Sequence, residues 1–176
     1  MIDFLVIYSS TTGNTKAVAT AVFNALPGTS KELCDIRDYH YDREAKFYFI
    51  GFWTNRGSCD ISILSLLSSL HGKKVALFGT CGMGRNAAYY QRIAGNVSAF
   101  VSEDCEYLGS FLCQGKMPEE VLLKYENLQK ENPAEAESIS RMIQNFHEAA
   151  SHPNEEDFTH AQDFVTKILK DCMHKL

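Results

Sequence analysis

Seven consecutive residues near the start of the chain carry a hydroxyl group, an amide or no side chain. They are Ser9, Ser10, Thr11, Thr12, Gly13, Asn14 and Thr15. They follow an apolar run and lead into helical spacing, so this turn places them at a helix N-terminus, where free N–H groups favour an anion. The turn lacks both the lysine of a Walker A loop and the GxGxxG pattern. It predicts a site where neutral donors hold a phosphate monoester; the alternative is an ordinary strand-to-helix turn with a Ser/Thr cap.

The elements that position this turn alternate between strand and helix. Nearly continuous apolar runs are typical of buried parallel strands, whereas a more polar run is typical of an edge strand. The predicted strands are residues 3–8, 30–36, 47–52, 74–80 and 107–113. The predicted helices between them are residues 14–26, 60–72 and 88–102, with Asp60 as an N-cap and Gly72 as a C-terminal stop. This alternation predicts an α/β layered sheet with right-handed crossovers.

The tail from Pro118 onward is rich in Glu, Gln, Lys and Asn and has three helix-like segments. These are residues 117–132, 133–150 and 155–176, with Pro118, Pro133 and Pro153 near their starts. Each segment has only a narrow apolar stripe. We therefore expect residues 118–176 to be a helical extension that covers a face of the sheet, within a single domain spanning residues 1–176.

Composition excludes several classes of function. The chain has 176 residues, 45% of them hydrophobic, and a formal net charge of -5 without a concentrated basic face, so no nucleic-acid partner is expected. No run reaches the length of a membrane span, and the first residues lack a signal pattern, so a cytoplasmic location is expected. The six cysteines form no CxxC pair and the six histidines are dispersed, so no metal site is predicted.

Residues 10–15 match, one for one, the loop that wraps the phosphate of FMN in flavodoxins, and the chain resembles the flavodoxin family over residues 1 to about 113. The resemblance implies a flavodoxin-like three-layer sandwich, with helices on both faces of a five-stranded parallel sheet of order 2-1-3-4-5, and FMN as cofactor. The motifs GFW, ALFGTCG and CQGKMP resemble a subgroup with a helical C-terminal extension. Some members of that subgroup accompany bilirubin reductases.

The resemblance also implies that two loops hold the flavin ring. The first contains Trp53, Thr54, Asn55, Arg56 and Gly57, and the second contains Thr80, Cys81, Gly82, Met83, Gly84 and Tyr89. Gly57 is expected nearest flavin N5, where the resembling proteins reorient a glycine peptide on reduction. Trp53 either lies against the ring or closes the edge of the core. Arg56 either points inward and stabilises the reduced, anionic ring, or points into solvent.

The second loop departs from the usual family pattern. Either Tyr89 reaches back to the ring, or backbone N–H groups of residues 82–84 border its pyrimidine carbonyls. Only three residues separate Cys81 from Arg85, too few for a phosphatase loop. Gln114 and Lys116 are expected at the carboxyl edge of the sheet, near the ring or a partner surface, or in a polar loop without such a role.

The resulting hypothesis is an electron carrier that binds FMN noncovalently, exchanges electrons with redox protein partners, and is a monomer or weak dimer. The alternative is an FMN-dependent reductase of a quinone, an NAD(P)H-linked acceptor or a tetrapyrrole, with Arg56, Arg85 and the tail around its pocket. A module that has lost its flavin is disfavoured, because the phosphate loop is intact.

Overall fold

The computed structural model describes residues 1–40, 42–84 and 86–174 of the chain. The strands are β1 (Ile2–Tyr8), β2 (Lys31–Asp35), β3 (Ala45–Trp53), β4 (Lys74–Cys81) and β5 (Glu106–Gln114). The α-helices are α1 (Asn14–Ala25), α2 (Ile61–Ser69), α3 (Ala87–Ser98), α4 (Glu119–Glu131), α5 (Ala136–Ala149) and α6 (Glu155–Met173). Two short 3-10 helices are η1 (Ile36–Asp38) and η2 (Pro133–Glu135).

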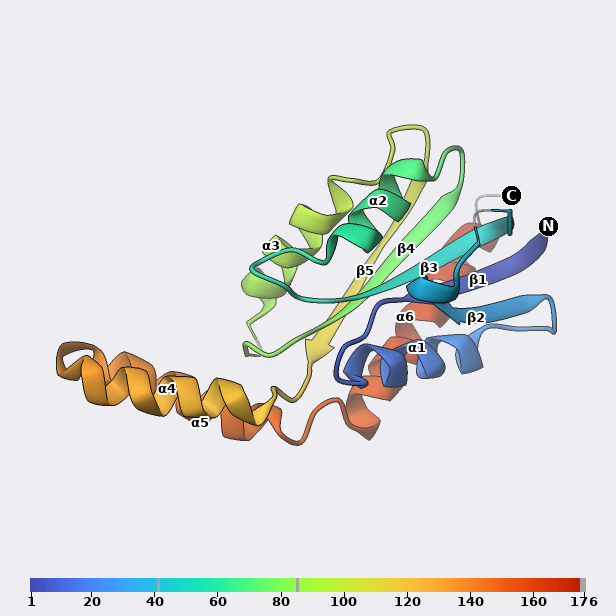
Figure 1. Ribbon diagram of the computed structural model, residues 1–176. Helices are drawn as coiled ribbons and strands as arrows, with labels where there is room; N and C mark the ends of the chain where they lie inside the picture. Colours follow the sequence, from blue (N-terminus) through green and yellow to red (C-terminus); the bar gives the residue numbers. More distant parts are fainter. Residues whose placement is uncertain (41, 85, 175–176) are drawn as a thin grey trace.

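The five strands form one parallel sheet of order β2-β1-β3-β4-β5, as predicted (Figure 1). In its register Tyr8 lies opposite Gly51, and Trp53 lies opposite Thr80. The carboxyl ends of β1, β3 and β4 therefore meet at one edge of the sheet, and the loops that follow them are neighbours. The order of the strands reverses between β1 and β3, and this is the point in such a sheet where ligands bind.

Alternate residues of the strands build two separate cores. Leu5 and Ile7 of β1 belong to the core beneath α2 and α3, whereas Val6 and Tyr8 belong to the core beneath α1 and α6. Because both faces of the central strands are covered, their residues are apolar without interruption, which is why their sequence lacks the alternation of a half-exposed strand.

The three tail helices differ from one another in position. The side chains of Ala161, Val165 and Ile168 in α6 are buried in the core that α1 shares with the sheet. In contrast to the expectation that all three helices cover a face of the sheet, α4 and α5 pack against each other and reach away from its carboxyl edge (Figure 1). We call these two helices the hairpin. Helix α4 contains no buried residue.

Candidate functional site

The turn after β1 leaves the N-terminus of α1 without a side-chain cap. Gly13 occupies the N-cap position with a φ of 88°, a left-handed conformation that favours glycine. Helices α2, α3 and α6 are capped instead by Asp60, Asn86 and Asn154. The first N–H groups of α1 are thus available to an external acceptor, and the positive end of the helix dipole lies there too.

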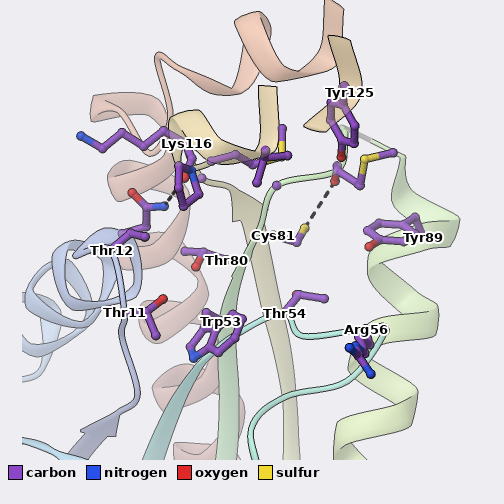
Figure 2. Close-up of a pocket in the computed structure, with 18 residues that line it drawn as sticks. Thr11, Thr12, Trp53, Thr54, Arg56, Thr80, Cys81, Tyr89, Lys116 and Tyr125 are labelled. Carbon is purple, nitrogen blue, oxygen red and sulfur yellow. Dashed lines mark hydrogen bonds between the residues drawn. The ribbon is translucent and has the colours of Figure 1, made fainter. Parts of the chain in front are cut away.

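A cavity of about 500 Å³ opens beside this turn at the carboxyl edge of the sheet (Figure 2). Its lining comes from the turn after β1, the ends of β3 and β4 with the loops that follow them, the start of α3, the segment after β5, and the first half of α4. The lining residues are Thr11, Thr12, Asn14, Trp53, Thr54, Arg56, Gly57, Thr80, Cys81, Gly82, Met83, Tyr89, Gly115, Lys116, Met117, Pro118, Val121 and Tyr125.

Within the first turn the polar side chains divide into two groups. Thr11 and Thr12 are exposed and line the cavity, which the buried Asn14 also borders. The others hold the turn in place: Ser10 Oγ accepts from the Gly13 N–H at 3.1 Å, and the buried Thr15 hydroxyl lies 2.9 Å from that of Thr80 in β4. Asn14 Nδ2 donates to the Lys116 carbonyl at 2.8 Å. The turn is thereby tied to both β4 and the segment after β5.

The loop after β3 makes a tight turn over residues 55–58. Asn55 and Ser58 exchange two backbone hydrogen bonds, of 2.9 and 3.0 Å, and the residues between them have positive φ angles of 48° for Arg56 and 86° for Gly57. The Gly57 carbonyl accepts from Asn96 Nδ2 of α3 at 2.8 Å. Helix α3 therefore holds the carbonyl of Gly57, the residue expected from the sequence to lie nearest flavin N5. The Arg56 side chain is exposed and borders the cavity.

Three aromatic residues from different elements line the cavity, namely Trp53, Tyr89 and Tyr125 of α4. Trp53 is the last residue of β3 and is half-buried, and Tyr89 lies in the first turn of α3 (Figure 2). The Arg92 guanidinium lies 5.3 Å from the centre of the Tyr89 ring, and burial raises the pKa of the Tyr89 phenol. Tyr89 therefore stays neutral and presents a rigid, polar-tipped ring.

The loop after β4 begins with a buried thiol. Cys81 Sγ lies 3.5 Å from the Met83 carbonyl, and burial raises the pKa of this thiol to about 12. An un-ionised thiol is a poor nucleophile, so this position has no sign of thiolate chemistry. Arg85, the other end of the run considered above, lies outside the described residues.

Most of the residues predicted from sequence line the cavity, and six do not. Those six are Ser9, Ser10, Gly13, Thr15, Asn55 and Gly84. Sequence reasoning left the role of Lys116 open, and the structure puts this residue at the cavity. The sequence-based prediction did not include five further residues that line the cavity: Gly115, Met117, Pro118, Val121 and Tyr125. The first three follow β5 directly, so the position of that strand in a parallel sheet was a usable signal.

Neither a metal-binding cluster nor a membrane-spanning helix is found in the described part of the chain. It contains no group of three or more His, Cys, Asp or Glu side chains that could hold a metal ion. It also has no helix that is both long enough and apolar enough to cross a membrane. The six cysteines are free thiols, and four of them are buried.

The chain is similar to known flavodoxin-like proteins in sequence. The family model described as "Flavodoxin domain" matches residues 5–166. A flavodoxin-like domain-containing protein named BilS from Clostridioides difficile is 35% identical over 168 residues, which cover 94% of this chain and 95% of that protein. A BilS from Clostridium symbiosum is 34% identical over 182 residues, covering 92% of this chain and 93% of that protein.

Solved structures share the fold at low sequence identity. A flavodoxin from Streptococcus pneumoniae has a TM-score of 0.59 at 15% identity, covering 96% of this chain and 98% of that one. An archaeal flavodoxin has a TM-score of 0.55 at 17% identity, with coverages of 97% and 98%. A Lactobacillus acidophilus flavoprotein in complex with FMN has a TM-score of 0.50 at 16% identity, with coverages of 64% and 93%. On the sequence match and the shared sheet topology, this chain belongs to the flavodoxin domain family.

Proposed function

We propose that this protein binds FMN noncovalently in the cavity and passes electrons between protein partners. One observation carries the proposal: the uncapped N-terminus of α1 and two exposed hydroxyls border a cavity that Trp53 and Tyr89 also line. A flavin mononucleotide has one part to suit each feature: a phosphate monoester for the helix N-terminus and its hydroxyls, and a flat aromatic ring for the aromatic side chains. The flavodoxin family match, and a flavoprotein neighbour that is in complex with FMN, support the same cofactor.

The phosphate would be held by Thr11, Thr12 and the free N–H groups at the start of α1. These donors are neutral, since the turn from Ser9 to Thr15 has no lysine or arginine. Hydrogen bonds to an ionised acceptor are about twice as strong as those between neutral groups, so several such donors suffice without a cation. Thr15 and Asn14 contribute by anchoring the turn to β4 and to the Lys116 carbonyl.

The ring would lie between the loops after β3 and β4, beside Trp53, Gly57 and Tyr89. The cofactor itself supplies the redox chemistry, and the protein sets the potentials and leaves one ring edge open to a partner. The first loop contributes a cation, Arg56, that borders the cavity. If this charge faces the ring, it favours negative charge there and makes reduction easier.

A second candidate is a reductase whose substrate lies beside the ring. The observation that favours it is the extra wall of the cavity, formed by Met117, Val121 and Tyr125. Because sheet and hairpin line the same cavity, we treat residues 1–176 as one functional domain. We also infer a cytoplasmic location, since free thiols suit a reducing compartment, and a monomer or weak dimer, as expected for a carrier that docks transiently.

Two measurements test the proposal. Calorimetric titration should show tighter binding of FMN than of riboflavin, because only FMN has the phosphate; absence of heat with either compound would refute the site. An anaerobic reductive titration of the FMN-loaded protein should proceed in two one-electron stages. Direct two-electron reduction with NAD(P)H turnover would favour the reductase instead.

A further inference from the structure

One side chain of α5, Asn145, connects the hairpin to the wall of the cavity. Its amide reaches the loop after β4, which is 61 to 63 residues earlier in the chain. Asn145 Nδ2 donates to the Gly82 carbonyl at 2.9 Å, and Asn145 Oδ1 accepts from the Gly84 N–H at 2.9 Å. A single planar group thus holds two backbone groups of the same loop.

A neighbouring amide from β5 reinforces this contact. Gln114 is buried, and its Nε2 donates to Asn145 Oδ1 at 3.1 Å and to the Gly82 carbonyl at 3.3 Å. The orientation of the Asn145 amide follows from its partners, since a backbone N–H only donates and a carbonyl only accepts. Asn145 is therefore needed as both donor and acceptor.

The loop is also closely packed against Met117, in the segment before the hairpin, and against Asn145. A Cβ at Gly82 would lie 2.5 Å from Met117 Cγ, and one at Gly84 would lie 3.4 Å from Asn145 Oδ1. Gly82 and Met83 line the cavity. The conformation of this part of the cavity wall is consequently set by Met117, just before the hairpin, and by Asn145 within it, and not only by the sheet that carries the loop.

We propose that Asn145 is a positioning residue for the flavin ring, acting through the loop of residues 82–84. The inference rests on the proposed function, since it assumes that the ring lies against this loop. Through Asn145 the hairpin holds the loop in the shape that accepts the ring. The N–H groups of Gly82 and Met83 would then face the ring edge that gains negative charge on reduction, whereas the Gly84 N–H is held by Asn145.

The test compares Asn145→Ala with a matched control, Gln144→Ala, in the full chain. Gln144 is the preceding residue on the same helix, is exposed, and donates to Glu148 of that helix. We expect Asn145→Ala to weaken FMN and riboflavin by the same factor, about tenfold, which is about 1.4 kcal/mol. The factor is the same because both compounds have the ring. The control should leave both affinities unchanged.

Two further readouts separate positioning from a general loss of stability. Asn145→Ala should shift the visible circular dichroism of bound FMN. It should also weaken reduced FMN more than oxidised FMN, which makes the midpoint potential more negative. Asn145→Asp keeps the acceptor for the Gly84 N–H but loses the donor to the Gly82 carbonyl. If the alanine variant does not fold, the aspartate variant should show the same losses of ring affinity.

The possible results distinguish this inference from the proposed function. If the wild-type protein binds neither FMN nor riboflavin, the proposed function fails and takes the inference with it. If the wild type binds FMN normally but the Asn145 variants keep its affinity, spectrum and potential, only the inference is overturned. A lower melting temperature of the apoprotein without those changes would also overturn it, because Asn145 would then serve the fold alone.

Discussion

Thr12 is the residue at which the phosphate assignment is most directly tested. Its side chain is exposed and lines the cavity, beside the N-terminus of α1. Thr12→Val keeps the shape and removes the hydroxyl. A hydrogen bond to a charged group contributes about 1.5 to 3 kcal/mol, so FMN affinity should fall roughly ten- to hundredfold while riboflavin affinity stays unchanged. Calorimetry measures both.

The matched control for this prediction is Thr20→Val. Thr20 is exposed on helix α1, which follows Thr12. Its hydroxyl donates to the Lys16 carbonyl, and it does not line the cavity. Its replacement should change neither affinity. An equal loss for FMN and riboflavin in the Thr12 variant would mean that Thr12 does not contact the phosphate.

Buried and partly buried thiols make stability depend on pH. Burial raises the pKa of Cys34 to about 11 and those of Cys59 and Cys81 to about 12, from an ordinary value of 9.0. Below pH 9 both folded and unfolded chains keep these protons. Between pH 9 and about 11 only the unfolded chain releases them, so the free energy of unfolding should fall as pH rises.

Urea unfolding at pH 8, 9 and 10 in the presence of a reductant measures this fall. In a variant with Cys59→Ala and Cys81→Ala the slope of stability against pH should be smaller, whatever its absolute stability. The same slope in both proteins would assign the fall to other groups.

At the scale of elements, α3 contains an interior residue that weakens it. Gly95 is exposed, and a Cβ added there would have no heavy atom within 4 Å. Gly95→Ala should therefore raise the free energy of unfolding by about 0.5 to 1 kcal/mol, because alanine loses less backbone entropy in a helix. Urea unfolding at neutral pH is the measurement.

Gly72 provides the contrast for this prediction. It also has open space around it, but its φ is 61°, in the region that disfavours residues with a Cβ. Gly72→Ala should lower stability where Gly95→Ala raises it. Stabilisation by both substitutions would mean that backbone conformation does not decide their effect.

At the scale of the whole molecule, negative charge is concentrated on the hairpin. Between Glu119 and Ala149 there are seven glutamates against two lysines and one arginine, a net charge of -4 out of the -5 of the chain. Glu119 and Glu120 are exposed at the start of α4, next to the cavity residues Pro118 and Val121. A basic redox partner would be steered toward this side of the molecule.

Electron transfer from the reduced, FMN-loaded protein to cytochrome c, a basic haem protein, measures this steering. Its second-order rate constant should fall steeply with salt, because the Debye length shrinks from about 30 Å at 0.01 M to about 3 Å at 1 M. Replacing Glu119 and Glu120 by Gln should lower the rate at low salt. Replacing Glu44 and Glu103, which precede β3 and β5 at the opposite edge, removes the same charge and should have little effect. Equal effects of the two pairs would exclude a directed role for the hairpin.

The sequence by itself determined the sheet and the turn after its first strand. Continuous apolar runs separated by helical spacing leave few arrangements other than a parallel sheet covered on both faces, and the order of small polar residues from Ser10 to Thr15 belongs to one turn. The apolar runs and the order of residues in the turn are both local properties of the chain. The predicted N-cap at Asp60 was confirmed for the same reason, since a cap acts on residues two and three positions away.

Only the tertiary structure decided what the tail does. A narrow apolar stripe shows that a helix packs on another element but does not say which one: α4 packs against α5, whereas α6 packs against α1 and the sheet. The bonds that complete the cavity join Asn14 to Lys116, 102 residues later, and Gly82 to Asn145, 63 residues later. Hydrogen bonds between such distant residues leave no periodic signal in a single sequence, because their partners are brought together only when the chain has folded.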